Sequence, residues 1–248
     1  MSKPRVVASI EARMGSSRLP GKVLYDIYGK PSIERLISRL QLCKNIDSII
    51  LATTDKPGDD PLAEWAINNN IAIYRGSEDD VLNRVVEAQR SMNSDIVVEI
   101  TGDCILLDPN IIDLGINTYL ANKFDVVTNA RIPSYAQGLD VQVYSLEILE
   151  QVEKTIFDPA VREHVSLYFY ENPLIYSVCN LMAPPQWERP NLRLQLDYKE
   201  DLDLIKALFQ RIEPRLGYSF GIEAIIEELN TDPTLEEINR HCEEKPVR

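Results

Sequence analysis

Near its start the chain carries the run Val6-Val7-Ala8-Ser9-Ile10, and the segment that follows is Glu11-Ala12-Arg13-Met14-Gly15-Ser16-Ser17-Arg18-Leu19-Pro20-Gly21-Lys22. The first run is short, apolar and rich in β-branched residues, so it predicts a strand. The second is rich in Gly, Ser and Pro and predicts a loop. In residues 31–40, apolar side chains recur at helical spacing. The opening unit is therefore a strand, a loop and a helix.

The same alternation continues along the chain and predicts an α/β fold. Further strands are predicted at residues 48–53, 71–74, 95–100, 125–129, 139–144, 175–180 and 192–196. Further helices are predicted at residues 61–69, 79–91, 110–121, 146–155, 199–211, 221–228 and 233–242. Strands that are apolar on both faces and separated by helices belong to a parallel sheet covered on both sides. We expect one domain over residues 1–248, with the irregular stretch at about 130–185 as an excursion from the sheet.

Composition excludes several classes of protein. The 248 residues include 26 Lys and Arg against 39 Asp and Glu, a net charge of −13, which disfavours nucleic-acid and anionic membrane surfaces as partners. The sequence shows neither a signal peptide nor a membrane span, so a cytoplasmic protein is expected. The cysteines lack the CxxC spacing of a zinc site, and no disulfide framework is predicted.

The loop after the first strand could hold a polyphosphate. Arg13 and Arg18 can each grip phosphate oxygens with two N–H groups, and Lys22 adds a point charge. Gly15 lets backbone N–H groups approach a ligand closely. The loop matches neither the Walker A pattern nor GxGxxG. A solvated basic loop is the alternative interpretation.

Two aspartates each follow a predicted strand. Asp103 follows the strand at residues 95–100, and Asp197 follows the one at 192–196. Ligands of open parallel sheets bind at the carboxyl ends of the strands, and Mg²⁺ prefers carboxylates together with substrate phosphates. The two side chains are therefore candidate ligands of one Mg²⁺ ion. Alternatively, Asp197 caps the helix that follows it.

Six motifs together resemble the spore coat polysaccharide biosynthesis protein F family, which is similar to the cytidylyltransferases that activate sialic acid and ketodeoxyoctonate. They lie in this order along nearly the whole chain: residues 12–24, residues 75–84, Thr101-Gly102-Asp103-Cys104, Gly138-Leu139-Asp140-Val141, Arg162-Glu163-His164-Val165 and residues 192–197. The resemblance implies a nucleotide-diphosphosugar-transferase-like, Rossmann-like fold with a mixed, mostly parallel sheet. It also implies CTP as donor, Mg²⁺ as cofactor, and a homodimer formed through the protruding segment at about 130–185.

The resemblance assigns roles to individual residues. Arg13, Arg18, Lys22 and Asp103 match the catalytic positions, with the three cations on the triphosphate. The remaining nucleotide-binding positions are Ala12 and Gly15 through their backbone, and Arg75, Ser77, Asp80 and Arg84 on the base and ribose side. Asp103 and Asp197 match the metal ligands. The expected acceptor-binding residues are Asp140, Arg162 and His164, although His164 also suits a core or capping role.

Two positions depart from the family pattern. Ile105 stands where the family usually has Pro, and Glu99 stands where an Arg is common. Neither change removes an expected metal ligand. The loss of an arginine near the crevice bears on which anionic acceptor is used.

The expected reaction is nucleotidyl transfer: an acceptor oxygen attacks the α-phosphorus of CTP in line and expels pyrophosphate. The acceptor would be a sugar acid or a phosphorylated small molecule in surface polysaccharide or glycoconjugate synthesis. Its identity and the choice of CTP over other nucleotides are left open by the sequence. The alternatives are a glycosyltransferase of the same fold and an inactive structural subunit of a polysaccharide pathway.

Overall fold

A seven-stranded sheet organises the chain, and the computed structural model describes residues 3–244. The strands of this sheet are β1 (Val6–Glu11), β4 (Ser48–Thr54), β5 (Ala72–Gly76), β6 (Ile96–Thr101), β7 (Val126–Thr128), β8 (Gln142–Ser145) and β9 (Val178–Asn180). Their order across the sheet is β5-β4-β1-β6-β8-β7-β9, and β2 (Asp26–Ile27) pairs separately with β3 (Lys30–Pro31).

The sheet is mixed and mostly parallel, as predicted. Strand β1 lies between β4 and β6 and runs parallel to both, and β4 is parallel to β5. Strand β8 is antiparallel to its two neighbours, β6 and β7, whereas β7 and β9 are parallel. The carboxyl ends of β1, β4, β5 and β6 therefore meet at one edge, which is where ligands bind in sheets of this kind.

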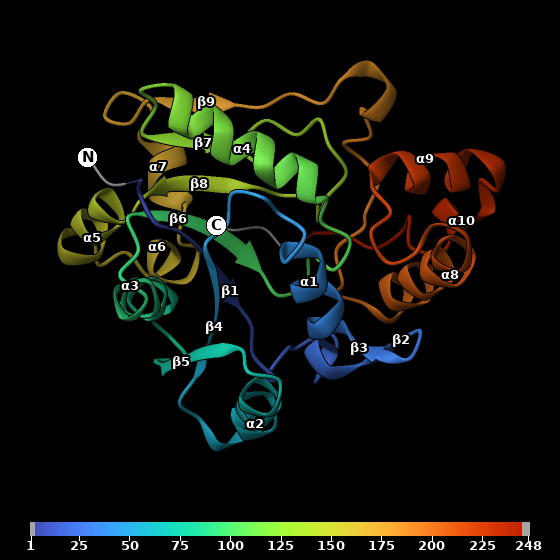
Figure 1. Cartoon of the computed structure of the whole chain (residues 1–248), viewed down its shortest axis with the longest axis horizontal. Coiled ribbons are helices and arrows are strands. Elements are labelled where there is room, and N and C mark those ends of the chain that lie inside the picture. Colours follow the sequence, from blue (N-terminus) through green and yellow to red (C-terminus); the bar gives the residue numbers. More distant parts are fainter. Residues whose placement is uncertain (1–2, 245–248) are drawn as a thin grey trace.

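Helices cover both faces of the sheet (Figure 1). The α-helices are α1 (Ser32–Leu40), α2 (Asp60–Asn68), α3 (Val81–Ser91), α4 (Pro109–Ala121), α5 (Leu146–Thr155), α6 (Pro159–Glu163), α7 (Leu167–Glu171), α8 (Lys199–Leu216), α9 (Ile222–Thr231) and α10 (Thr234–Glu237). Short 3₁₀ turns lie at η1 (Lys22–Leu24), η2 (Pro57–Asp59) and η3 (Pro185–Trp187). None of the helices within residues 3–244 combines the length and apolarity needed to cross a membrane.

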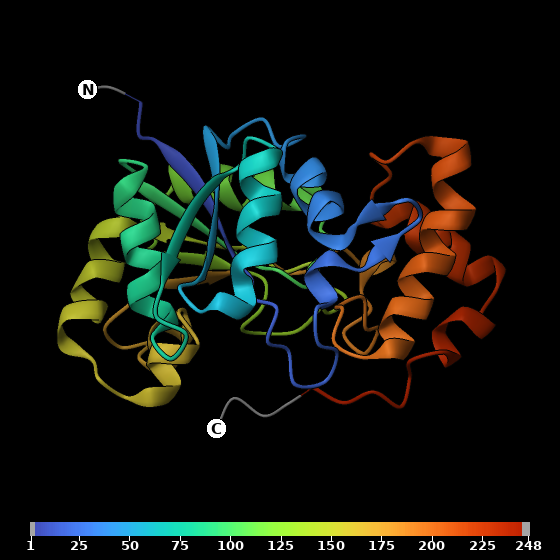
Figure 2. The ribbon, with the colours of Figure 1, turned by 90° about the horizontal axis from the view of Figure 1, so that it is seen from below.

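The alternation of side chains along β1 separates two hydrophobic layers. Ala8 and Ile10 point into the larger core, which contains the buried faces of α1, α2, α4, α8 and α9. Val7 points to the opposite face, where α3 packs. The helices α5, α6 and α7 extend this second layer over β7 and β8. Figure 2 shows α8 and α9 grouped at the far end of the molecule from α3 and α5.

One predicted strand is wrong. Residues 192–196 make only an isolated bridge, between Gln137 and Arg193, and are not a strand of the sheet. Leu192, Leu194 and Leu196 do alternate into the core, which explains the strand-like pattern. However, the backbone of this segment bonds to different loops in turn, since Leu194 N donates to Gln137 O and Leu196 N donates to Asp103 O. The helix predicted at residues 233–242 is shorter, and helices α6 and α7 were not predicted.

The segment at 130–185 was predicted as an excursion from the sheet, but it contributes two strands to it, β8 and β9. Its sequence predicts exposed apolar side chains at residues 132, 135, 167 and 170, because they lie outside the regular alternation of strands and helices. Ile132 is 50% exposed, but Tyr135 is buried in the larger core. Leu167 and Tyr170 are partly buried against the second layer. Further exposed apolar side chains are Phe157, Leu174, Ile175 and Met182.

A close backbone approach requires glycine at position 102, immediately after β6. A Cβ atom there would lie 2.7 Å from Ala12 Cβ and 2.9 Å from Glu11 O. We expect Gly102→Ala to lower the free energy of unfolding by about 1–3 kcal/mol, because the two strand ends must separate to admit the methyl group. Urea unfolding followed by circular dichroism measures the change. Gly58→Ala is the control, since a Cβ atom there meets nothing within 4 Å; equal effects of the two changes would contradict the prediction.

The predicted homodimer is tested by mass. We expect a particle of twice the 28.3 kDa chain mass, because exposed apolar side chains in residues 130–185 are shielded from water by self-association. Light scattering coupled to size exclusion at micromolar concentrations gives this mass. Replacing Leu174 and Ile175 by Ser should shift it toward the monomer. A monomer mass for the unchanged chain would contradict the prediction.

Candidate active site

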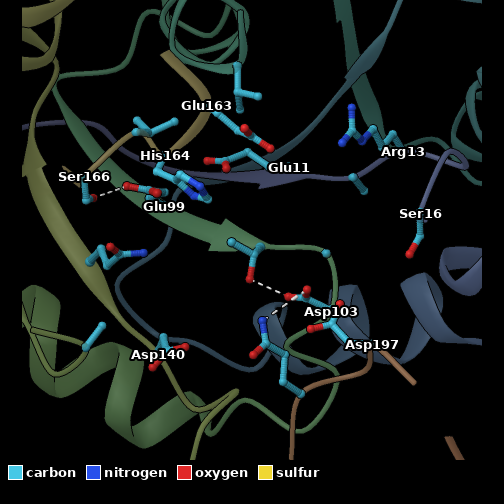
Figure 3. Close-up of a pocket in the computed structure, with 18 of the residues that line it drawn as sticks. Glu11, Arg13, Ser16, Glu99, Asp103, Asp140, Glu163, His164, Ser166 and Asp197 are labelled. Carbon is cyan, nitrogen blue, oxygen red and sulfur yellow. Dashed lines mark hydrogen bonds between the residues drawn. The ribbon is translucent and has the colours of Figure 1, made fainter. Parts of the chain in front are cut away.

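A cavity of about 590 Å³ lies at the carboxyl ends of β1 and β6. Its wall combines residues from the loop after β1, the ends of β1 and β6, the segment before β8, the residues around α6 and the segment before α8. The sheet topology explains this convergence, because β1 and β6 are parallel neighbours and the chain leaves both at the same edge. Figure 3 shows the side chains that point into this space.

Lys22 joins the three chain segments at the centre of the cavity wall. Its Nζ atom lies 3.0 Å from Asp103 Oδ2 and 2.9 Å from Asp197 Oδ1. Both carboxylates thus face one small region although they are far apart in sequence, and they lie close together in Figure 3. Burial alone would lower the pKa of Lys22, but the charges of Asp103 and Asp197 outweigh it and raise the pKa above its usual value. Lys22 therefore stays protonated.

Asp197 is surrounded by cations. In addition to Lys22, Arg18 lies 2.6 Å and Arg193 2.7 Å from its Oδ2 atom. Burial would raise the pKa of Asp197, but the hydrogen bonds and charges of Arg18 and Lys22 outweigh burial and hold it well below its usual range. The carboxylate of Asp201 accepts hydrogen bonds from the backbone N–H groups of Asp197 and of the next residue, so Asp201 caps α8. The side chain of Asp197 therefore does not cap this helix and pairs instead with Arg18, Lys22 and Arg193.

Asp103 is oriented by neutral partners as well as by Lys22. Thr101 Oγ1 donates to Asp103 Oδ1 over 2.6 Å, and Gln195 Nε2 donates to Asp103 Oδ2 over 3.2 Å. The backbone is also fixed, because Leu196 N donates to Asp103 O over 3.0 Å. These bonds tie the end of β6 to the segment before α8. They explain how residues 103 and 197 meet without a second strand.

The first loop is held by its own contacts. Met14 N donates to Asp59 Oδ1, and Gly21 N donates to Met14 O over 2.8 Å, which closes the loop on itself. At the outer edge, Arg13 lies 3.2 Å from Glu78 Oε1. Gly15 is exposed, and a Cβ atom there would lie 3.7 Å from the same Glu78 oxygen.

The opposite part of the cavity is acidic. Glu11, Glu99, Asp140 and Glu163 all line it. Figure 3 shows Glu11, Glu99 and Glu163 gathered around His164, away from Arg13 and Ser16. Glu99 is only 4% exposed, and its Oε2 atom accepts hydrogen bonds from Tyr144 and Ser166.

Burial changes the protonation of these acids. It raises the pKa of Glu11 well above its usual value, assisted by the nearby charge of Glu99 and opposed by Arg84. Burial also raises the pKa of Glu99, against the hydrogen bonds from Ser166 and Tyr144. For Asp140, burial and the charge of Asp103 raise the pKa to about 7, although the Gly138 N–H opposes the change.

The structure brings most of the predicted site residues into one cavity wall. The predicted residues that line it are Ala12, Arg13, Arg18, Lys22, Arg84, Asp103, Asp140, His164 and Asp197. Of these, His164 is exposed at the cavity wall and is not buried in a core.

Five other predicted residues are not part of that wall: Gly15, Arg75, Ser77, Asp80 and Arg162. Arg75 lies 2.7 Å from Asp60 and donates to Thr54 O. Asp80 caps α3 through Asn83 N and pairs with Arg162. Their assignments to nucleotide and acceptor remain predictions.

Several residues of the wall were not predicted as site residues. Glu11 and Glu99 have a sequence signal, because an acidic residue inside an apolar strand is rarely buried without a role. Gln195, which lines the wall, and Arg193, which does not, contact the aspartates directly, but nothing in their spacing indicates it.

A second group that could hold a metal ion lies near the carboxyl end of the described chain. Single ligand atoms of Glu200, His241 and Cys242 lie within 4.8 Å of one another, and His241 is exposed. The sequence spacing did not predict this cluster.

The comparisons with known proteins decide the family. A model of the cytidylyltransferase family matches residues 7–231, which includes the cavity wall from Glu11 to Asp197. This chain belongs to the cytidylyltransferase family. The spore coat polysaccharide biosynthesis protein SpsF of Bacillus subtilis is 32% identical to it over 231 residues, covering 90% of this chain and 93% of that protein.

Solved structures of this kind share the fold. A cytidylyltransferase from Leptospira borgpetersenii superposes with a TM-score of 0.88 at 29% identity, covering 94% of this chain and 97% of the other. A CMP:2-keto-3-deoxy-manno-octonic acid synthetase, solved in complex with CTP, superposes with a TM-score of 0.62 at 18% identity. That match covers 84% of this chain and 99% of the other. The expected Rossmann-like fold and the family resemblance are confirmed.

The raised pKa of Asp140 predicts a pH-dependent stability in this cytidylyltransferase. The neutral acid favours the folded state; this contribution is complete below about pH 4 and is lost as the pH rises through about 7. Asp140→Asn cannot ionise, so its free energy of unfolding relative to wild type should increase by about 2 kcal/mol between pH 5 and pH 8. Urea unfolding at both pH values measures this. Asp79→Asn, at an exposed position, is the control, and a pH-independent difference for Asp140→Asn would contradict the assignment.

Proposed function

We propose that this protein transfers the cytidylyl group of CTP to an oxygen of a sugar acid or a phosphorylated small molecule and releases pyrophosphate. The observation that carries the proposal is the meeting of Arg18 and Lys22 with Asp103 and Asp197 in one cavity. Cations placed against a departing pyrophosphate stabilise the charge that develops in the transition state. Carboxylates beside them suit a divalent cation. The family membership and the CTP complex of a protein with the same fold support CTP as the donor.

In the proposed reaction the protein positions the two substrates and neutralises the charge of the triphosphate. The acceptor oxygen attacks the α-phosphorus in line with the leaving pyrophosphate, and Arg13, Arg18 and Lys22 bind the triphosphate oxygens. All three now contact carboxylates, Arg13 on Glu78 and the other two on the aspartates. Nucleotide binding is therefore an exchange of partners within a site that is already organised.

The residues present fit a magnesium ion. Asp103 and Asp197 approach the same ammonium group within 3.0 Å, so their oxygens converge, and the donor set contains neither thiolate nor imidazole. When bound there, Mg²⁺ would supply positive charge to phosphate oxygens. As the loop cations turn toward the triphosphate, the two aspartates lose positive partners. They are the residues that would hold the ion.

The proton on the attacking oxygen depends on the acceptor. A carboxylate or phosphate oxygen is already anionic and needs no base. A hydroxyl nucleophile needs one, and Asp140 and His164 both line the cavity. The pKa of Asp140, raised to about 7, suits a base near neutral pH.

The similarity to a protein named for spore coat polysaccharide biosynthesis supports a role in making a surface polysaccharide or glycoconjugate. The reaction type is the first thing to test. Purified protein is incubated with each of the four nucleoside triphosphates, Mg²⁺ and a panel of sugar acids and phosphorylated sugars. A parallel incubation replaces the triphosphates by nucleotide sugars. Pyrophosphate release with CTP and one acceptor supports the proposal. Transfer from a nucleotide sugar without pyrophosphate would indicate a glycosyltransferase, and no reaction with any panel member would indicate an inactive subunit.

The cations of the first loop provide the sharper test. Replacing Arg18 or Lys22 by Ala should lower kcat by about 10²-fold or more, since each side chain meets charge that grows on the leaving group. Lys123→Ala, an exposed lysine, is the matched control and should leave kcat unchanged. Near-wild-type turnover in both loop variants would remove this loop from the active site.

A further inference from the structure

The two parts of the cavity have opposite charge. Arg13, Arg18 and Lys22 of the first loop line the cavity, and Arg18 and Lys22 lie against Asp197. The carboxylates of Glu11, Glu99 and Glu163 gather around His164 in another part of it (Figure 3). Because the triphosphate is polyanionic, its place is beside the loop cations. The acidic part is then left for the portion of the acceptor that lies away from the reacting oxygen.

The acidic part is built on the sheet. Glu11, at the end of β1, lies two residues after Ser9, and Ser9 is in register with Glu99 on β6. Glu99 is in turn paired with Gln142 on β8. Side chains two residues apart on a strand share a face, so Glu11, Glu99 and Gln142 lie on the same face of three adjacent strands. A rigid sheet therefore holds these polar groups at the bottom of the cavity.

One of these groups has no partner. The Oε1 atom of Glu11 is buried, and no residue within 3–244 forms a hydrogen bond with it. Buried carboxylate oxygens in native proteins normally accept a hydrogen bond, so this atom indicates a missing donor. Figure 3 shows the Glu11 side chain directed into the space that it shares with Glu99 and His164.

Charge compensation is also incomplete there. Arg84, which lines the cavity and is 3% exposed, opposes the charge of Glu11, but one of its guanidinium N–H groups already donates to Ser77 O over 2.6 Å. Arg84 is the cation that opposes the charge of Glu11, whereas Glu99 is opposed only by the hydroxyl groups of Ser166 and Tyr144. Asp140 and Glu163 also lie on the wall. Burial raises the pKa of both Glu11 and Glu99, as expected when carboxylates lack cationic partners.

We propose that the acceptor carries a protonated amino group, which binds between Glu11 and Glu99 while its reacting acidic oxygen faces the triphosphate beside the loop cations. This inference rests on the proposed cytidylyl transfer and specifies its substrate class: amino-substituted sugar acids or amino-substituted phosphate esters. An ammonium group has three donors and no acceptor, so it supplies both the hydrogen bond that Glu11 lacks and the positive charge that the wall lacks. A second acidic group on the acceptor would instead face like charges.

The test uses acceptors that differ only at the amino group. The pairs are 2-aminoethyl phosphate with 2-hydroxyethyl phosphate, glucosamine 6-phosphate with glucose 6-phosphate, and glucosaminuronic acid with glucuronic acid. Binding is measured by calorimetry to the full chain with Mg²⁺ and the unreactive α,β-methylene analogue of CTP. We expect the amino member of at least one pair to bind about tenfold or more tightly than its partner.

The variants assign that preference to the two glutamates. Glu11→Gln and Glu99→Gln keep the shape, and in Glu99→Gln the amide oxygen can still accept from Tyr144 and Ser166. We expect each to reduce the preference for the amine at least several-fold, whereas Glu64→Gln, at an exposed position, should not. Circular dichroism verifies that the variants are folded.

The outcomes separate this inference from the proposed function. Binding of the CTP analogue without an amine preference in any pair, or with a preference that both variants retain, overturns the inference and leaves cytidylyl transfer in place. Failure of the folded protein to bind the CTP analogue overturns both. An amine preference that is lost in Glu11→Gln or Glu99→Gln supports the inference.

Discussion

The ammonium group of Lys22 between Asp103 and Asp197 is the interaction on which the rest of the site depends. It connects the loop after β1, the end of β6 and the segment before α8, which are separated by 81 and 175 positions along the chain. A buried charge that loses a partner is destabilised, so separating the three segments is unfavourable. Arg18 and Arg193 extend the same network on Asp197. These charges of the protein itself hold the three chain segments of the site together.

The alternation of side chains along β1 determines the remaining layout. Ile10 faces the large core, whereas Glu11, one residue later, faces the opposite side and enters the cavity. The loop then begins at Ala12, whose methyl group lies so close to residue 102 that only glycine fits there. The acidic and the basic parts of the cavity thus arise from consecutive segments of one chain, one fixed by the sheet and the other by the loop.

Much of the fold could be predicted because its signals are local. The apolar runs of β1, β4 and β6 and the helical spacing in α1 depend only on neighbouring residues. The prediction at residues 192–196 was wrong because alternation reports which side chains are buried and says nothing about backbone partners. There, the partners are Gln137 and Asp103 rather than a neighbouring strand. Asp103 and Asp197 were nevertheless correctly expected to lie close together, although bonds from Leu196 and Gln195 to Asp103, and not a second strand end, hold Asp197 there.

The parts of the site that could not be predicted depend on contacts across the chain. Arg75 and Arg18 are both arginines in family motifs, yet Arg75 pairs with Asp60 and Arg18 with Asp197. No spacing in the sequence distinguishes these outcomes, because each is decided by the acid that the fold places within reach.

The net charge of −13 likewise does not report where the individual cations lie. An acidic protein can bind a triphosphate only if its cations are brought together, and here each loop cation is held by a carboxylate. In the proposed reaction, phosphate oxygens would replace these carboxylates. The favourable free energy of nucleotide binding would then be the difference between phosphate and carboxylate as partners, so the geometry of the exchange would matter more than the number of positive charges.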